Sequence, residues 1–473
     1  MSTSTSKPLY ALGVQELHAA YAAKELSPVE VARSVNERIA AYEPELHATW
    51  LFRPELALEQ ARASEARWLA GKPLGTLDGV PVTIKDNLAT KGDAMPLGTA
   101  AYELVPMSYD SPPAARLKED GAVLVAKTTM PDLGMLSSGL SSFHELSRNP
   151  WDLSRTPGGS SAGAGAAAAA GYGPLHVGTD IGGSLRLPAS WCGIYTLKPS
   201  FGRIPLSSPY MGRCAGPMTR TVADSALMMA SVAQPDDRDY SELPPPVIDW
   251  TAFEVDPSFI KGKRVALHMD AGCGLPLDPQ IAEAVRRAAK RIEAAGAVIE
   301  EIPPFMTPKM LQGMDHFWRM RSCIDIQAMA PEVRAKILPY IREWAESAAG
   351  FSGAHIFDAY SQFIAARAAA IAATKAYDFV ISPVSPNMPA PADHASPTND
   401  PMLPLEHIGF TVPYNMSEQP AASINCGYSA EGLPTGLQIA GRRFDDLGVL
   451  QFSRAFEQIR EPQKPWPEPN TSR

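Results

Sequence analysis

Two glycine-rich segments of the sequence carry serine hydroxyls at positions where a turn would expose them. Segment 156–165 contains Ser160 and Ser161, and segment 178–188 contains Ser184. Glycines around these serines let the backbone adopt positive φ angles and expose its N–H groups. The two segments therefore predict an active-site cradle in which a serine does the chemistry.

A serine nucleophile needs a proton acceptor, and the sequence offers lysine more readily than histidine. None of the nine histidines belongs to an H-x-H or H-E-x-x-H pattern, so a metal site or a histidine-based triad is not indicated. Lys85 follows the apolar, β-branched run 77–84. Burial can lower the pKa of a lysine from about 10.4 toward roughly 7–8, so Lys85 is the candidate base.

Three other glycine motifs are weaker interpretations of the same segments. Residues 159–163 match the G-x-S-x-G nucleophile elbow, which needs a strand directly before it, but segment 151–157 is polar and interrupted by proline. Residues 163–168 imitate a dinucleotide-binding loop and also lack that strand, and no Gly-Lys-Ser/Thr completes a Walker A loop. A flexible Gly/Ser linker is disfavoured because apolar elements flank both segments.

Composition excludes several classes of protein. The 473 residues carry a net charge of −9 without a Lys/Arg block, which argues against nucleic acid or an anionic membrane as a partner. The five cysteines are scattered without a C-x-x-C pair, so neither a disulfide framework nor a zinc site is indicated. Segment 1–8 lacks the apolar core of a signal peptide, and no run is long enough for a membrane span. We expect a cytoplasmic protein.

The first half of the chain alternates helical and strand patterns. We expect helices over 13–42, 55–70, 112–119 and 162–170, and strands over 77–84, 121–126 and 175–178. Ser27, Pro28 and Glu30 form a helix-start signal. This alternation predicts an α/β fold with a large mixed β-sheet covered by helices on both faces.

The second half predicts a mostly helical insert and a return to the sheet. A surface crossing over 235–246, rich in proline and acid, precedes a strand at 263–268, a helix at 279–295 and a mostly helical stretch over 305–380. Strands at 377–382 and 421–425, a helix at 447–460 and an extended tail from Glu461 follow. We divide the chain into N-terminal helices (1–75), a catalytic core (76–240), a helical cap section (241–375) and a C-terminal return (376–473), forming one catalytic domain overall.

Six segments together resemble the amidase signature family of Ser-Ser-Lys amide hydrolases, in the family's order. They are 79–87 around Lys85, 149–161, 178–188 around Ser184, 192–203, 216–224 and 432–441, which leaves mainly 240–375 unmatched. Ala162 and the stretch 194–196 stand where the family pattern has glycine. These differences make the local packing less predictable, but they do not involve the residues expected to react.

The resemblance implies a mechanism and the amidase signature fold. Ser184 would be the nucleophile, Ser160 the bridging serine after a cis peptide bond, Lys85 the base and Ser161 a supporting residue. Backbone N–H groups of Ile181, Gly182 and Gly183, with that of Ser184, would form the oxyanion hole. No metal or organic cofactor is required. The implied reaction is hydrolysis of an amide C–N bond through an acyl-enzyme.

The substrate is left open between two classes. Aromatic and Met side chains over 305–320, with Trp318 among them, suit an aryl or alkyl amide, with carbamates or esters as further substrates, although these side chains are equally suited to filling the core. Gly134 and Met135, in the loop after strand 121–126, would join Trp318 as substrate-binding residues. The alternative is the glutamine-hydrolysing A subunit of a glutamyl-tRNA(Gln) amidotransferase. The oligomeric state is open, and a homodimer is compatible with the sequence.

Overall fold

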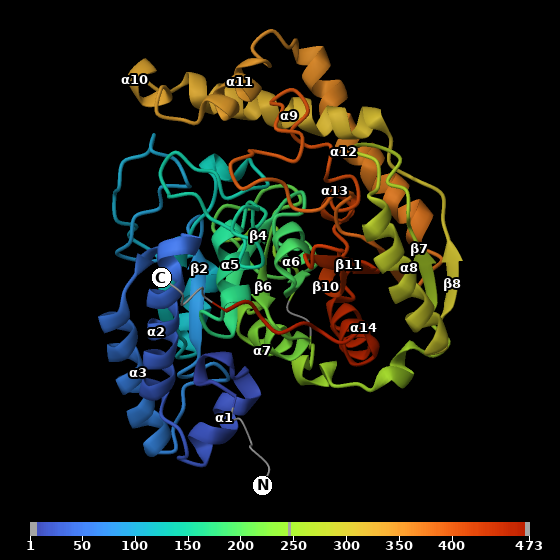
Figure 1. The fold of residues 1–473 in the computed structure, drawn as a ribbon. Coiled ribbons are helices and arrows are strands. Elements are labelled where there is room, and N and C mark those ends of the chain that lie inside the picture. Colours follow the sequence, from blue (N-terminus) through green and yellow to red (C-terminus); the bar gives the residue numbers. More distant parts are fainter. Residues whose placement is uncertain (1–6, 245–246, 469–473) are drawn as a thin grey trace.

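The computed structural model describes residues 7–244 and 247–468 and contains one eleven-stranded mixed sheet (Figure 1). The strand order across the sheet is β1-β3-β2-β4-β6-β5-β10-β11-β9-β7-β8. The strands are β1 (Thr49–Phe52), β2 (Pro81–Lys85), β3 (Val123–Thr128), β4 (Leu175–Asp180), β5 (Tyr195–Lys198), β6 (Cys214–Thr219), β7 (Arg264–Leu267), β8 (Val298–Glu301), β9 (Phe379–Pro383), β10 (Ala421–Tyr428) and β11 (Pro434–Gly441).

Helices surround this sheet and account for most of the remaining elements. They are α1 (Val14–Ala22), α2 (Pro28–Leu46), α3 (Pro54–Leu69), α4 (Pro112–Glu119), α5 (Ala162–Ala170), α6 (Arg186–Cys192), α7 (Val222–Val232), α8 (Pro279–Ala294), α9 (Pro308–Gln327), α10 (Pro331–Arg334), α11 (Pro339–Glu346), α12 (Gly353–Thr374), α13 (Val412–Met416) and α14 (Asp446–Ile459). The predicted start of α2 is confirmed, because Ser27 Oγ accepts a hydrogen bond from the Val29 N–H and the Glu30 carboxylate accepts one from the Ser27 N–H.

Helices cover both faces of the sheet, as predicted. On one face Gly178 of β4 lies against Ser161 and Leu185, beside α5 and α6. The next residue back along the strand, Val177, belongs to the main hydrophobic cluster, to which α7, α8 and α14 contribute on the opposite face. This alternation follows from the period of two in a β-strand, and it encloses the sheet in apolar layers.

The alanine and glycine sequence of α5 is explained by how closely it packs. Every residue of this helix is buried. A Cβ on Gly163 would lie 2.1 Å from the Ala48 carbonyl oxygen and 2.5 Å from the Thr129 nitrogen, and a Cβ on Gly165 would lie 2.8 Å from Pro188 Cβ. Small residues therefore allow the N-terminus of α5, with its serines, to sit directly on the sheet.

The sheet brings two of the predicted segments to the same edge. β2 runs parallel to β4, with Val82, Thr83 and Ile84 opposite Leu175, His176 and Val177. Because the carboxyl ends of parallel neighbours meet, Lys85 at the end of β2 and the turn after β4 lie side by side.

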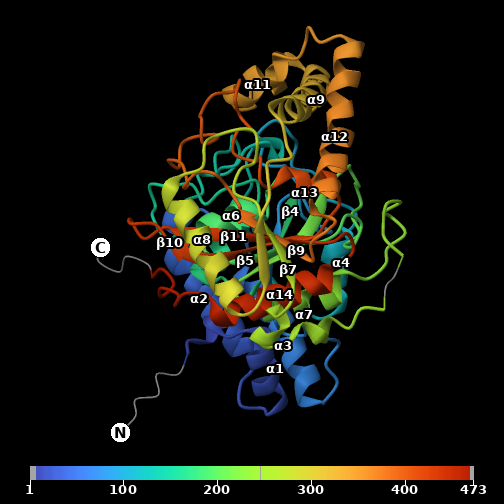
Figure 2. The same cartoon turned by 90° about the vertical axis from the view of Figure 1, so that its right-hand side faces the viewer.

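The middle of the chain is mostly helical, and it also extends the sheet. Helices α9, α11 and α12 stand together above the body of the molecule (Figure 2). The strand predicted at 263–268 is present as β7, which pairs in parallel with β9. Strand β8 pairs in parallel with β7, and the two form the far edge of the sheet.

Five strands were not predicted: β1, β5, β6, β8 and β11. Of these, β6 and β11 contain Gly and Pro, and β8 is largely exposed, so neither an apolar run nor strict alternation marks them. Pro245 and Pro246 of the predicted surface crossing, and the tail beyond Glu468, lie outside the described residues.

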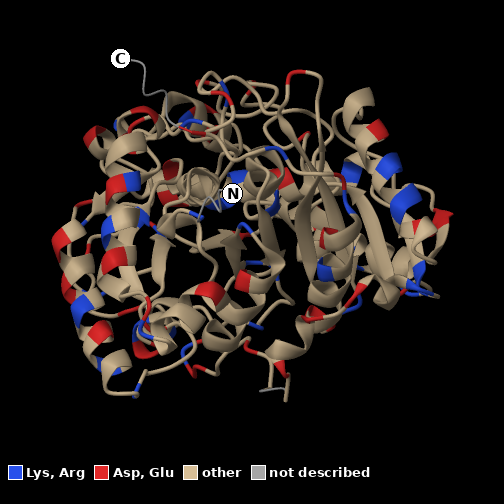
Figure 3. Ribbon diagram, turned by 60° about the horizontal axis from the view of Figure 1, so that its bottom comes forward, with Lys and Arg blue, Asp and Glu red and all other residues tan. Residues whose placement is uncertain are grey.

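Charged residues of both signs are interspersed along the outer helices on the face that Figure 3 shows. None of the described helices is long and apolar enough to cross a membrane. Within 7–244 and 247–468 there is no group of three or more His, Cys, Asp or Glu side chains arranged to hold a metal ion.

Candidate active site

Lys85 is the centre of a buried cluster of hydroxyl groups. Its side chain is fully buried, and Nζ lies 2.9 Å from Ser160 Oγ, 3.0 Å from Ser161 Oγ and 3.1 Å from Thr179 Oγ1. The partners come from the start of α5 and the end of β4, which the sheet holds beside the end of β2. Lys85, Ser160 and Ser161, which the sequence predicts to act together, are therefore in direct contact.

The surroundings of Lys85 favour its neutral form. Burial lowers the pKa of Lys85 well below its ordinary value, the positive charge of Arg213 lowers it further, and Asp180 and Asp86 oppose the shift only in part. A neutral amine has a lone pair, so Lys85 can accept a proton from a hydroxyl in contact with it.

Ser160 and Ser161 have different surroundings. The Gly159–Ser160 peptide bond is cis, as the resemblance implied. Ser160 lines the main cavity, whereas Ser161 is turned toward β4, where its Oγ donates to the Thr179 carbonyl at 3.1 Å and accepts from the Thr179 N–H at 3.3 Å. Ser161 ties α5 to β4, and Ser160 faces the space where a substrate could bind.

Ser184 lies in the turn between β4 and α6 and lines the same cavity as Ser160. Its carbonyl oxygen accepts a hydrogen bond from the Ser161 N–H at 3.3 Å, which joins the two serine turns.

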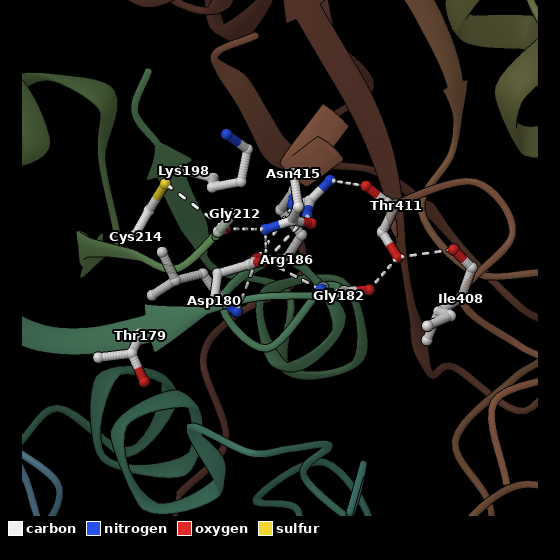
Figure 4. Close-up of polar contacts among 12 residues, drawn as sticks. Thr179, Asp180, Gly182, Arg186, Lys198, Gly212, Cys214, Ile408, Thr411 and Asn415 are labelled. Atoms are coloured by element: carbon white, nitrogen blue, oxygen red, sulfur yellow. Dashed lines mark hydrogen bonds and ion pairs between the residues drawn. The ribbon is translucent and has the colours of Figure 1, made fainter. Parts of the chain in front are cut away.

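Asp180 shapes this turn from within (Figure 4). Its carboxylate accepts from the N–H groups of Gly183 at 2.8 Å and Leu185 at 3.1 Å. It also pairs with Arg186 through Nε at 3.0 Å and Nη2 at 2.9 Å, and accepts from Asn415 Nδ2 at 2.8 Å. Burial alone would raise the pKa of Asp180, but Arg186 and Asn415 outweigh it and hold this pKa far below its usual range. The carboxylate is ionised and fixes the turn.

Residues more than 200 positions away complete the support. Arg186 Nη1 donates to the Thr411 carbonyl oxygen at 2.7 Å, and Thr411 Oγ1 donates to the Gly182 carbonyl oxygen at 2.6 Å. Both contacts are drawn in Figure 4. Sequence reasoning missed Asp180, Arg186, Thr411 and Asn415. Only the first two lie in a recognised segment, and nothing in the sequence pairs them with the other two.

The turn also defines which N–H groups are available to an oxyanion. Ile181, Gly182 and Ser184 line the cavity, and their N–H groups have no acceptor among the residues that the structure describes. The Gly183 N–H differs, because it donates to the Asp180 carboxylate. Of the predicted oxyanion-hole residues, Gly183 is thus occupied within the protein.

A cavity of about 390 Å³ opens in front of these groups. The three predicted substrate-binding residues, Gly134, Met135 and Trp318, all line it. Gly134 has a φ of +69°, and a Cβ there would lie 3.1 Å from Met130 Cε and 3.5 Å from Ser160 Oγ. The glycine therefore keeps the space beside Ser160 open.

The sequence left the aromatic and Met side chains over 305–320 open between a wall of the cavity and core, and for most of them the structure shows core. Trp318 lines the cavity, whereas Phe305 stacks on His268 with ring centroids 4.4 Å apart, and Phe317 packs on Tyr360 and Phe363. A helix presents only one stripe to a cavity, so most of these side chains fill core instead. The remaining apolar lining comes from other segments, chiefly Leu97, Met130, Leu133, Leu136, Ile181, Leu187, Leu405 and Ile408.

Sequence reasoning also missed a polar end of the cavity. Tyr210 and Arg213, from the loop before β6, and Arg321, one turn after Trp318 on α9, line it. No motif surrounds these residues, although the spacing of Trp318 and Arg321 would place both on one face of a helix.

Comparison with known proteins agrees with this geometry. The family model described as Amidase matches residues 30–450. The A subunit of the glutamyl-tRNA(Gln) amidotransferase of Cyanothece sp. is 32% identical over 491 residues, covering 96% of this chain and 98% of that protein. Further curated relatives with the same name are 32–33% identical.

Solved structures include enzymes of different names on the same fold. A bacterial aryl acylamidase of the amidase signature family superimposes with a TM-score of 0.87 at 28% identity, covering 96% of this chain and 97% of the other. The A subunit of the glutamyl-tRNA(Gln) amidotransferase of Thermotoga maritima superimposes with a TM-score of 0.80 at 25% identity, covering 98% and 99%. The family match, the fold and the described cluster together confirm the resemblance, and the chain belongs to the amidase signature family of hydrolases that act on amide C–N bonds.

Proposed function

We propose that this protein hydrolyses small-molecule amides through an acyl-enzyme on Ser184, with Ser160 and Lys85 as a proton relay. The observation that carries the proposal is the contact of 2.9 Å between the buried Lys85 Nζ and Ser160 Oγ, in the wall of the cavity that Ser184 lines. A metal or organic cofactor has no part in this scheme.

The relay begins with neutral Lys85. Its lone pair takes the proton of Ser160 Oγ as Ser160 takes the proton of Ser184 Oγ, and the Ser184 oxygen forms a bond to the amide carbonyl carbon. The carbonyl π electrons move onto oxygen to give a tetrahedral oxyanion. When the C–N bond breaks, the proton held on Lys85 returns through Ser160 to the leaving nitrogen, and the acyl group remains on Ser184.

The turn after β4 supplies the stabilisation that this step needs. The N–H groups of Ile181, Gly182 and Ser184 are available to the oxyanion, while Asp180 holds the turn in place through Gly183. One such donor contributes on the order of 3–4 kcal/mol to the transition state. Water then attacks the ester carbonyl by the same relay in reverse, which releases the acid and restores the Ser184 hydroxyl.

The cavity supports small amides with an apolar portion, because nine of its lining residues are Leu, Met or Ile. The TM-score and the identity are both higher with the aryl acylamidase than with the T. maritima protein, which points the same way. On this proposal the isolated chain is active without a partner protein.

The second candidate is the glutamine-hydrolysing A subunit of a glutamyl-tRNA(Gln) amidotransferase. A specific observation favours it: the curated relatives carry this name over nearly the whole of both chains, at a higher identity than the solved amidases. By sequence comparison alone this candidate is the stronger.

One panel separates the candidates. The purified chain, with Ser184→Ala as the matched inactive control, is assayed for release of acid and amine from aliphatic, aryl and carbamate substrates and from glutamine. Turnover of aryl or alkyl amides by the isolated chain supports the small-molecule amidase. Activity confined to glutamine, and seen only with the other subunits of an amidotransferase added, replaces it with the second candidate.

A further inference from the structure

One end of the cavity presents hydrogen-bond donors that no protein group satisfies. Tyr210 Oη, Trp318 Nε1 and Arg321 Nε are buried, and none has a partner at hydrogen-bonding distance and angle among the described residues, although Arg321 and Trp318 lie near enough to the Tyr210 hydroxyl to lower its pKa. All three residues line the cavity that Ser184 lines, together with Arg213. The Trp318 side chain is 4% exposed, so its N–H is shut off from bulk solvent. A buried donor left unpaired is costly, so this end of the cavity favours an acceptor atom of a bound water or of a ligand.

The three unpaired groups can all act as hydrogen-bond donors. Trp and Arg N–H groups can only donate, and a protonated tyrosine hydroxyl can donate. Burial, with the charge of Asp325, raises the pKa of Tyr210, although the Arg321 and Trp318 side chains oppose the rise, so this hydroxyl keeps its proton at neutral pH. The ligand group that fits all of them is therefore an acceptor with several lone pairs.

The charge at this end is positive. Neither Arg213 nor Arg321 forms an ion pair with any described residue. Arg213 and Arg321 line the same cavity, and burial, reinforced by the charge of Arg321, lowers the pKa of Arg213. Their other contacts are with neutral groups: Arg213 Nη1 donates to the Ser208 carbonyl oxygen at 3.1 Å, Arg321 Nη2 lies 3.5 Å from Met135 Sδ, and the Arg321 guanidinium lies 5.0 Å from the Tyr210 ring centroid.

Two carboxylates also line the cavity, and neither forms an ion pair with Arg213 or Arg321 among the described residues. Asp180 is taken by Arg186. Asp325 stands one turn beyond Arg321 on α9, is exposed, and forms no ion pair with Arg321 among the described contacts. We call this end of the cavity, formed by Tyr210, Arg213, Trp318 and Arg321, the cationic recess, and Asp325 lies at its solvent side.

We propose that Arg213 and Arg321, with the Tyr210 hydroxyl and the Trp318 N–H, bind a carboxylate of the substrate, so that the enzyme acts on amides that carry a second, ionised group. This inference rests on the proposed function for the amide that reaches Ser184. Guanidinium groups bind carboxylates with paired, charge-assisted hydrogen bonds, and the apolar walls between Ser184 and the recess suit the intervening chain. Half-amides of dicarboxylic acids and glutamine both belong to this class.

Binding is measured first, without turnover. The Ser184→Ala protein is titrated calorimetrically with glutarate and with glutaramide, its uncharged counterpart. This measures the affinity of the recess for each compound in the absence of turnover. We expect glutarate to bind about 10- to 100-fold more tightly than glutaramide, the effect of hydrogen bonds to a charged group. Arg321→Met and Trp318→Phe in the Ser184→Ala background should weaken the binding of glutarate by a larger factor than the binding of glutaramide, and Arg321→Lys should restore part of the affinity for glutarate. Arg286→Met, which removes an exposed guanidinium on α8, is the matched control.

Turnover is measured second on the otherwise wild-type chain. The ratio of kcat/KM for glutaramate over butyramide should fall about 10- to 100-fold in Arg321→Met, with unchanged fluorophosphonate labelling of Ser184 showing that the variant is folded. Equal binding of glutarate and glutaramide, or an unchanged ratio in Arg321→Met, overturns the carboxylate recess while amide hydrolysis stands. Tight, Arg321-dependent glutarate binding by a chain that hydrolyses no amide would retain the recess and refute the proposed function.

Discussion

Replacing Asp180 by asparagine should loosen the turn between β4 and α6, which carries Ser184, and destabilise the whole protein. The substitution keeps the shape of the side chain but removes its charge, and it leaves the fully buried Arg186 without its anionic partner. Five hydrogen bonds to the carboxylate are weakened or lost, from Gly183, Leu185, Asn415 and two nitrogens of Arg186. Breaking one side of a buried ion pair costs about 3–5 kcal/mol, and we expect a loss of unfolding free energy in this range.

Urea denaturation followed by tryptophan fluorescence measures this loss. Asp358→Asn is the matched control, since Asp358 pairs with Lys309 at 3.2 Å while both side chains are more than half exposed. An exposed pair contributes about 0–1 kcal/mol, so the control should unfold close to the wild type. Because the folded-state pKa of Asp180 is depressed, its contribution is present above the unfolded pKa of about 3.9 and is lost as the pH falls below that value. A midpoint for Asp180→Asn equal to that of Asp358→Asn would refute the role given to the carboxylate.

Three further predictions concern the relay and the cavity. Activity should rise with pH as Lys85 loses its proton. Because burial and then Arg213 lower the pKa of Lys85, Arg213→Met should move this rise to higher pH. A pH–rate profile of kcat/KM that is the same in Arg213→Met and the wild type would show that Arg213 does not affect the pKa of Lys85. Gly134→Ala should lower kcat/KM and cost about 1–2 kcal/mol of stability, because the residue has φ of +69° and its Cβ would lie 3.5 Å from Ser160 Oγ; an active, fully stable variant would contradict this. Trp318→Ala should change kcat/KM unequally for bulky and small amides while labelling of Ser184 by a small reagent persists, and an equal loss for every substrate would show that Trp318 only packs the core.

The residues proposed to react could be located from the sequence because they lie in short local patterns. Lys85 ends an apolar strand run, and Ser160 and Ser184 lie in glycine turns at the ends of elements, whereas the separate role proposed for each serine comes from the family resemblance. The α/β fold was predictable for the same reason, since the alternation of elements is a local signal.

The supports of the site were not predictable, because they depend on pairing across the fold. Thr411 and Asn415 reach the nucleophile turn from α13 and the residue before it, and no spacing in the sequence links them to Asp180. Strands β6 and β11 pair through their backbones in the middle of the sheet. The Gly and Pro residues in their sequences obscure the pattern by which a strand is predicted. The cationic recess is formed by a loop residue, Arg213, and a helix residue, Arg321, that meet only in the folded chain.

The most direct test of the mechanism is the identity of the residue that becomes acylated. The protein is treated with a fluorophosphonate, and separately mixed with an aryl ester and quenched in acid, and the modified peptide is sequenced by mass spectrometry. Both reagents should modify Ser184, and Lys85→Ala should slow the modification severely while leaving its position unchanged. An adduct on Ser160 or Ser161, or a wild-type rate of acylation in Lys85→Ala, would contradict the Ser184–Ser160–Lys85 relay.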